Sequence, residues 1–302
     1  MHIWDVVFFF EVLISGMLSG VMYSLVALGF VLIYKASGVF NFAQGAMVLL
    51  AALTFVRFLE MGMPMWLALA VTLLVMVVLA VIIEKVVLSR LVNQPLIILF
   101  MATIGLNYFL EGLAQGVWDS QVHGLDLGIE DVPWAALEEA TGMFVSVFDV
   151  VAAVIAGSLV LVLSIVFHRT KVGRALRAVS DDHQAAMSVG IPLDRLWAIV
   201  WAIAGVVALV AGALWGQRLG VQFSLSIIAL KALPVLILGG FNSILGAIVA
   251  GLIIGSGEKL AEVFLGPYVG GGIENFFPYV LAMLILFIRP EGLFGDKIIE
   301  RV

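Results

Sequence analysis

The sequence contains no cysteine, so it forms no disulfide bond, attaches no haem through a thioether and offers no thiolate to a metal. Its compartment therefore cannot be inferred from redox chemistry. The four histidines, His2, His123, His168 and His183, lack the spacing of metal ligands, and we expect no metal site. A GxxxxGK(S/T) phosphate-binding loop is also absent, so we expect that the chain neither hydrolyses ATP itself nor acts as an enzyme.

Charged residues are scarce as well, at 12% of the chain against about a quarter in soluble domains. Hydrophobic residues make up 63%, and the mean hydropathy is +1.19. Long, unbroken apolar runs fit membrane-crossing helices rather than barrel strands. The sequence therefore predicts an all-α polytopic integral membrane protein, with residues 1–302 forming a single transmembrane domain. Because no Lys or Arg precedes the first apolar run, we expect no cleaved signal peptide.

Nine apolar runs set the predicted number of crossings at eight or nine. They lie at residues 7–34, 42–58, 65–83, 96–115, 150–167, 196–217, 227–239, 244–259 and 276–288. The runs at 227–239 and 244–259 are short or broken by glycine. Nine crossings follow if every run spans the membrane. Eight follow if residues 7–58 form one crossing and a broken or re-entrant helix around Asn41.

Charge asymmetry predicts the orientation. Residues 117–149 carry seven acidic side chains and no Lys or Arg, whereas residues 168–195 carry five Lys or Arg. By the positive-inside rule, 117–149 is an extracytoplasmic loop and 168–195 a cytoplasmic one. Lys85, Arg90 and the tail from Arg289 then also lie inside. Nine crossings with an outer N-terminus and an inner C-terminus are consistent with all these placements, and eight is the alternative.

The cytoplasmic loop at 168–195 is the one long polar segment between apolar runs. Within it, Ala175 to Ser188 contains no Gly or Pro. Its apolar residues, Leu176, Val179, Ala186 and Met187, lie within helical reach of one another, which predicts one short amphipathic helix outside the bilayer. Gly190 and Pro192 would end it. In the outer loop, residues 132–139 predict a short interfacial helix with Pro133 near its first turn.

Two amides, Asn41 and Gln44, lie three residues apart in the segment FNFAQG (residues 40–45), which Gly38 and Gly45 bracket. Their spacing puts both on one helical face, and polar groups at membrane depth are functional candidates because burying them unpaired is costly. One hypothesis is a helix break whose freed backbone groups point at a ligand. The alternative is an ordinary interhelical hydrogen bond, with small residues allowing close packing.

Asn107, Glu111 and Gln115 recur at four-residue spacing and form a polar stripe along the run at 96–115. Such a stripe can line an aqueous path, or it can mark the approach to the outer interface. Lys231 is a lone cation in an apolar run, three residues before Pro234. Snorkelling to an interface is the first interpretation of Lys231. Pairing with Glu111 and a position at a cavity are the alternatives.

Five segments occur in an order that is informative. They are FNFAQG (40–45), GRALRA (173–178), QAAMSVG (184–190), LILGGFNSILGA (236–247) and RPEGLFG (289–295). QAAMSVG is similar to the EAA-xxx-G loop of bacterial ABC importer permeases, with Gln184 where the pattern has Glu and without its later proline. The other four resemble signature segments of the branched-chain amino acid permease family. No single segment is specific, but all five occur in the order found in the family and are spread over nearly the whole chain.

This resemblance implies the transmembrane permease subunit of a binding-protein-dependent ABC importer, a multi-pass protein of the bacterial inner membrane. The implied partners are a second, longer permease subunit, two cytoplasmic ABC ATPase subunits and a periplasmic substrate-binding protein. Membrane lipid surrounds the chain, and no nucleic acid is expected. ATP and Mg²⁺ would be bound by the ATPase subunits, so the chain itself would carry no cofactor.

The resemblance also implies roles for single residues. The loop at 168–195 would be the coupling loop, and its ATPase contacts would be Arg174, Arg177, Asp181, Asp182, Gln184, Ala185, Ala186 and Gly190. The alternative for these charges is a solvated loop that obeys topology alone. The substrate path would hold Asn41, Gln44, Asn107, Glu111 and Lys231.

The substrate stays open at the level of sequence. The family pattern INFAHG reads FNFAQG here, and the change from His to Gln at Gln44 removes a titratable group. Branched-chain amino acids are the first expectation, with urea, short amides or aromatic acids as alternatives, and both homodimer and heterodimer are open. A competing hypothesis is an ATP-independent secondary transporter, for which Lys231 and Glu111 are the available ion site. An intramembrane enzyme lacks a nucleophile and base at matching depth.

Overall fold

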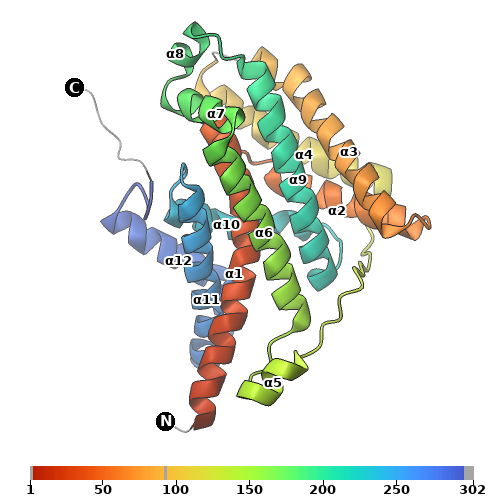
Figure 1. Ribbon diagram of the computed structural model, residues 1–302, viewed down its shortest axis with the longest axis vertical. Helices are drawn as coiled ribbons and strands as arrows, with labels where there is room; N and C mark the ends of the chain where they lie inside the picture. Colours follow the sequence, from red (N-terminus) through yellow and green to blue (C-terminus); the bar gives the residue numbers. More distant parts are fainter. Residues whose placement is uncertain (1–2, 92–93, 296–302) are drawn as a thin grey trace. The chain divides into compact units, whose positions relative to one another are not determined.

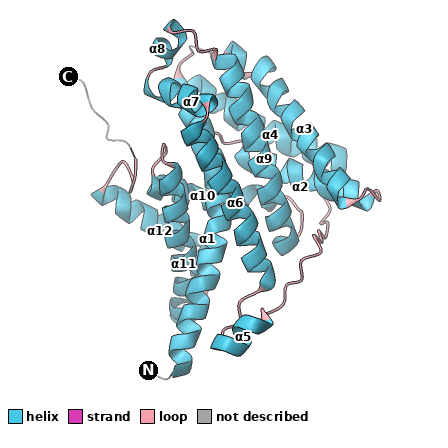
Figure 2. Cartoon of the chain, viewed as in Figure 1, coloured by secondary structure: helices cyan, strands magenta, loops and turns pink. Residues whose placement is uncertain are grey.

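The computed structural model describes residues 3–91 and 94–295, which contain helices and loops but no strand (Figures 1 and 2). The all-α prediction is confirmed for these residues, while His2 and the end of the predicted inner tail lie outside them. The helices are α1 (Ile3–Ser37), α2 (Gln44–Glu60), α3 (Met65–Val86), the 3₁₀ turn η1 (Leu88–Arg90), α4 (Leu96–Trp118), α5 (Ala135–Thr141), α6 (Val147–Arg169), α7 (Lys171–Asp181), α8 (His183–Ser188), α9 (Leu193–Leu219), α10 (Leu225–Gly239), α11 (Ile244–Val269) and α12 (Ile273–Ile288).

Eight of the nine predicted apolar runs lie wholly in a helix, and the run at 42–58 begins two residues before α2. Six of these helices, α1, α3, α4, α6, α9 and α11, are long and apolar enough to cross a membrane, which indicates a multi-pass membrane protein. The others, α2, α10 and α12, have 17, 15 and 16 residues. At about 1.5 Å per residue they fall short of a hydrocarbon core of about 30 Å. The count of eight or nine crossings therefore stays a prediction.

The predicted interfacial helix in the outer loop is present as α5, but it begins after Pro133. Trp134 is its N-cap residue, and Pro133 instead pairs with Ser146 in an isolated β-bridge. No residue of α5 is buried. The outer loop is thus held by backbone pairing next to the helix rather than by packing of the helix itself.

The chain forms two compact units, each built from separate parts of the sequence. Unit 1 contains Met1–Ala27, Gly128–Val160 and Lys231–Val302, and unit 2 contains Leu28–Leu127 and Leu161–Leu230. Helices α1, α6 and α10 each contribute residues to both units.

Unit 2 is built around α2. Every residue from Gln44 to Val56 is buried, because α2 packs against α3, α4 and α9. Gly212 of α9 allows the close approach, since a Cβ added there would lie 2.7 Å from the carbonyl oxygen of Val48. A helix that is apolar on all sides needs neighbours on all sides. Its surroundings explain how a helix of 17 residues holds a central place.

Unit 1 is built on contact between the first half of α1 and α11. Gly16 and Gly20 of α1 meet Gly255 and Gly251 of α11, with the four-residue spacing of a GxxxG pair on both helices. A Cβ on Gly16 would lie 2.6 Å from the carbonyl oxygen of Gly255. Because the backbones are this close, the hydroxyl of Ser24 donates a hydrogen bond across the interface to the carbonyl of Ala247, at 3.0 Å.

Two of the signature segments lie against each other in unit 1. The amides of Leu293 and Phe294 donate hydrogen bonds to the carbonyls of Leu238 and Gly239, at 2.8 and 3.2 Å. The segments 236–247 and 289–295 are therefore parts of one structure, in which the end of the chain covers the turn between α10 and α11.

A cluster of charged side chains fastens the loop that follows α4 in unit 2. His123 lies between two carboxylates, with Nδ1 2.8 Å from Oε1 of Glu60 and Nε2 3.0 Å from Oδ1 of Asp119. Arg57 donates to the other oxygen of Glu60 at 2.6 Å. Backbone hydrogen bonds in both directions join His123 to Val221 in the loop between α9 and α10. The cluster thus ties three segments of unit 2 together.

The protonated form of His123 is favoured in this cluster. Burial lowers the pKa of His123, but the hydrogen bonds and charges of Asp119 and Glu60 together outweigh it, so the pKa lies above its ordinary value. A raised pKa means that the contribution to stability is complete below about pH 6.5 and is lost as the pH rises through the pKa of the folded state.

We predict that His123→Gln raises the rate of proteolytic cleavage within residues 119–127 at pH 6 by about threefold or more, because the carboxylates lose a charged donor. The measurement is the rate of cleavage in this loop by a broad-specificity protease, with cleavage in the outer loop at 128–146 as internal reference. The difference from the parent chain should shrink as the pH is raised towards about 9, because His123 loses its proton as the pH rises through its folded-state pKa. Equal protection of the parent loop at pH 6 and pH 9 would contradict this account.

Candidate functional site

The predicted coupling loop contains two short helices, α7 and α8, and the prediction of a single helix over Ala175 to Ser188 was wrong. Asp182 interrupts it, with an extended backbone and a side chain that accepts hydrogen bonds from the amides of Gln184 and Ala185, at 2.8 and 3.0 Å. This is an N-cap. An Asp side chain competes with the helix for nearby amides, so a segment without Gly or Pro can still break.

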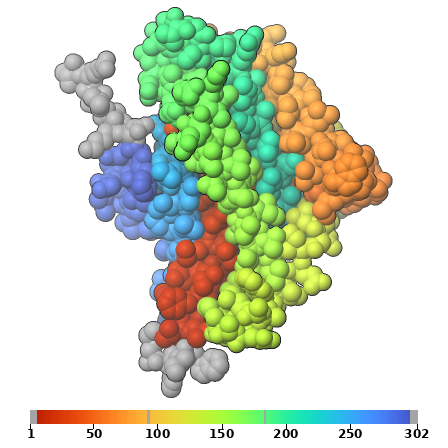
Figure 3. All heavy atoms as spheres, in the orientation of Figure 1, coloured from red at the N-terminus to blue at the C-terminus, as the bar shows by residue number. Residues whose placement is uncertain are grey.

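The amphipathic pattern of this loop is confirmed. Leu176, Val179 and Ala186 are buried, and Met187 is half-buried. Gly190 ends the segment with φ +84°, and Pro192 is the N-cap of α9. Residues 171–188 lie at the surface in the space-filling view (Figure 3). Of the predicted ATPase contacts, Ala186 is buried within the chain, whereas Arg174, Arg177, Asp181, Asp182, Gln184, Ala185 and Gly190 are exposed.

Helix α7 is fastened to the end of α6. Arg177 donates a hydrogen bond of 2.6 Å to the carbonyl of Phe167, and Thr170 caps α7 by accepting from the amide of Gly173, at 3.3 Å. A Cβ at Gly173 would overlap the backbone of Phe167. Arg177 therefore holds the loop in place, while the side chain of Arg174 is exposed.

A cavity of about 390 Å³ joins the coupling loop to the helix break after α1. It is lined by Ser37, Gly38, Leu91, Gln94, Leu96, Leu99, Ser180, Gln184, Leu193 and Trp197. The indole of Trp197 donates a hydrogen bond of 2.9 Å to the carbonyl of Ala36 at the end of α1. The structure thus brings Gln184 of the predicted coupling set and the predicted break at Gly38 to one cavity.

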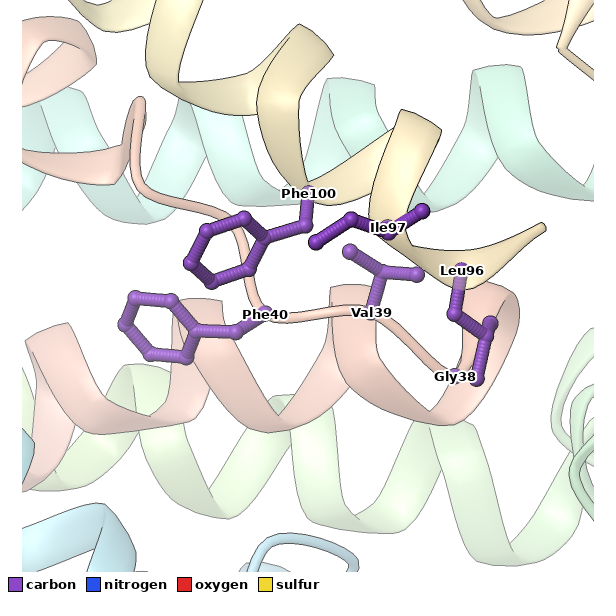
Figure 4. Close-up of a pocket in the computed structure, with 6 residues that line it drawn as sticks. All are labelled: Gly38, Val39, Phe40, Leu96, Ile97 and Phe100. Carbon is purple, nitrogen blue, oxygen red and sulfur yellow. The ribbon is translucent and has the colours of Figure 1, made fainter.

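An apolar pocket of about 280 Å³ lies next to this break (Figure 4). Val39 and Phe40 come from the extended segment after α1, and Leu96, Ile97 and Phe100 come from the first turns of α4. Phe40 stacks on Phe30 with ring centroids 4.6 Å apart. The aromatic residue that replaces the Ile of the family pattern therefore belongs to a ring cluster.

Asn41 and Gln44 are both fully buried, and they contact each other. The amide of Asn41 donates to Oε1 of Gln44 at 3.4 Å, and its oxygen accepts from the amide of Ala43 at 3.0 Å. The prediction that both lie on one helical face was wrong, because this turn at Asn41 delays the start of α2 to Gln44. The predicted break is present, with Gly38 at φ +70°. Among the described residues, Nε2 of Gln44 has no hydrogen-bond partner.

The polar stripe of α4 lies at the border of its buried face. Asn107, Glu111 and Gln115 are half-buried, next to the buried Leu106 and Leu110. This position is consistent with residues that line a substrate path and equally with residues near the membrane–water interface. Their role stays a prediction.

Lys231 is half-buried in α10 and belongs to unit 1, whereas Glu111 belongs to unit 2. Within unit 1, the charge of Lys231 acts on Glu258 of α11, a buried carboxylate that the sequence analysis missed. The signal was a single Glu inside an apolar run. The predicted run ends at residue 259, one residue after Glu258, whereas α11 continues to Val269.

Comparison with known proteins covers the whole described fold. The family model for the permease component of branched-chain amino acid transport systems matches residues 12–288. The chain is 28% identical over 310 residues to the high-affinity branched-chain amino acid transport system permease protein LivH of Escherichia coli K12, covering 98% of each chain. It is 25% identical over 309 residues to the corresponding protein BraD of Pseudomonas aeruginosa, covering 99% of each.

A solved structure shares the fold. PsaBC from Streptococcus pneumoniae, in complex with Fab, aligns with a TM-score of 0.51 and 14% identity over 96% of this chain and 93% of that one. Since the family match extends over both units and includes the first four of the five signature segments, the chain belongs to the family of permease components of branched-chain amino acid transport systems.

Proposed function

We propose that this chain is one of two permease subunits of a binding-protein-dependent ABC importer in the bacterial inner membrane, and that it forms part of the path for branched-chain amino acids. The names of LivH and BraD support this substrate class. The observation that carries the proposal is the exposed pair α7 and α8, fastened to α6 and broken by a capped turn at Asp182. It occupies the position of a coupling loop in the family.

The proposed topology has nine crossings, with the N-terminus outside and the C-terminus inside. In the described part of the chain, six long apolar helices, two shorter ones (α10 and α12) and the mostly buried α2 support it. The charge asymmetry between residues 117–149 and 168–195 supports the orientation. In this topology α7 and α8 face the cytosol, where two ATPase subunits bind ATP and Mg²⁺, and residues 117–149 face the periplasmic binding protein.

The proposed coupling runs through the cavity between α8 and the break after α1. Gln184 lines this cavity together with Gly38 and Trp197, and the indole of Trp197 donates a hydrogen bond to the carbonyl of Ala36. A displacement of α8 by closing ATPases is therefore passed to the end of α1. The segment that moves with it carries Asn41 and Gln44, which leave their mutual hydrogen bond when the path opens.

We predict that proteoliposomes with this chain, a second permease subunit, both ATPases and the binding protein accumulate radiolabelled leucine when ATP is supplied, and not otherwise. Unlabelled urea, a short amide and an aromatic amino acid serve as competitors, and we expect isoleucine and valine to compete best. Gradient-driven leucine uptake by this chain alone, without ATPases, would contradict the proposal and support a secondary transporter.

Arg174→Glu should lower leucine uptake by about tenfold or more while membrane insertion is unchanged, because it reverses an exposed charge at the ATPase contact. Lys171→Glu is the matched control, since Lys171 is exposed on the same helix but outside the predicted contact set. Arg177 is unsuitable because its reversal removes the donor to Phe167. Equal uptake by the Arg174 and Lys171 variants would remove the coupling role from Arg174.

A further inference from the structure

Glu258 is a buried carboxylate with an unused acceptor. Its residue is 2% exposed, in the middle part of α11. Tyr23 of α1 hydrogen-bonds to the carboxylate, but Oε2 has no hydrogen-bond partner among the described residues. A carboxylate oxygen left unpaired at membrane depth costs free energy, which makes Glu258 a candidate for binding a ligand.

Lys231 supplies the opposite charge on the neighbouring helix of unit 1. Its charge acts on Glu258, yet among the described residues no salt bridge joins the two side chains. Lys231 is half-buried, so its ammonium keeps some access to a ligand or to water. The cation and the anion are therefore near each other without direct contact.

In the proposed topology both residues lie at membrane depth. Gly239 at the end of α10 touches Gly246 near the start of α11. Along the helix axes, Lys231 lies about 12 Å and Glu258 about 18 Å from this contact, at about 1.5 Å per residue. A hydrocarbon core of about 30 Å includes both positions. Neither group can rely on bulk water there.

We propose that Glu258 and Lys231 bind the two charged groups of a zwitterionic α-amino acid on its way through the membrane, an inference that rests on the proposed function. Oε2 of Glu258 accepts from the ligand ammonium, and Lys231 donates to the ligand carboxylate. An α-amino acid carries these groups on one carbon, so it fits between an anion and a cation that do not touch. Tyr23 positions the carboxylate. Urea and short amides lack both charges and gain nothing from this site.

The test uses the complete permease and ATPase complex in nanodiscs without the binding protein, so that the binding protein imposes no selectivity. Binding of radiolabelled leucine is measured with three competitors: leucine, the 2-hydroxy acid that lacks the ammonium, and the amine that lacks the carboxylate. In the parent complex we expect both analogues to compete at least about tenfold more weakly than leucine, because each leaves one buried charge unpaired.

The variants Glu258→Gln and Lys231→Met should each weaken leucine binding by about tenfold. Glu258→Gln should also reduce the disadvantage of the hydroxy acid, and Lys231→Met that of the amine. Lys259→Gln is the matched control, because it removes the other cation whose charge acts on Glu258, and that cation is already paired with Glu274 at 3.2 Å. It should leave the order of the competitors unchanged.

This pattern separates recognition from a structural role. If the pair only held α10 against α11, the two variants would weaken the binding of all three ligands equally. That result would overturn the proposal. The proposal would also be overturned if the parent complex bound leucine no better than the two analogues, or if it bound no leucine. ATP-driven leucine uptake by the same complex tests the proposed function independently, and it can succeed while the assignment of Glu258 and Lys231 fails.

Discussion

The structure depends on the constraint that every polar group at membrane depth must find a partner inside the protein. The hydroxyl of Ser24 reaches a carbonyl on the facing helix, Trp118 donates to Thr54, and Trp197 donates to the end of α1. These bonds require backbones that approach closely, which the glycines of α1 and α11 permit. Among the described residues, the buried side-chain atoms that lack a hydrogen-bond partner include Nε2 of Gln44 and Oε2 of Glu258, in the segments proposed to move or to bind. They also include Nε of Arg57, Oγ1 of Thr72 and Oε1 of Glu84, which lie elsewhere in α2 and α3.

The same constraint explains why the coupling loop differs from the rest of the chain. Residues 171–188 keep only a narrow apolar face, through Leu176, Val179 and Ala186, and expose charge elsewhere. The loop is nevertheless firmly attached, because Arg177 and Thr170 bond it to α6. The attachment at one end and the cavity at the other support the proposed coupling role of the loop.

Much of the fold follows from the sequence alone. The nine apolar runs, the polar loop and the break after Gly38 are patterns of hydropathy and glycine, which act locally and are visible in one chain. The break at Asp182 and the late start of α2 were missed, because both come from side chains that compete for backbone amides, and periodicity does not register this. The extension of α11 to Val269 was missed as well, since Glu258 and Lys259 resembled the end of a run.

The site was predictable only in part. Asn41 with Gln44 and the coupling residues stand out as polar groups in unusual places. The structure brings Gln184 of the coupling set to one cavity with Gly38 at the helix break, while Asn41 and Gln44 are not among the residues that line it. The charge of Lys231 acts on Glu258 from a different helix, which sequence spacing does not show, so the sequence offered Glu111 instead. His123 was read as one of four scattered histidines, although its two carboxylate partners come from the ends of α2 and α4.

The central claim is that the loop at residues 168–195 faces the cytosol, where the proposed ATPase subunits bind it. Because the chain has no cysteine, single cysteines report its orientation directly. Val189 in the loop and Val122 in the acidic segment are 77% and 64% exposed. With a membrane-impermeant maleimide, Val122→Cys should be labelled in intact cells, and Val189→Cys only after the membrane is opened. Labelling of Val189→Cys in intact cells would contradict the account.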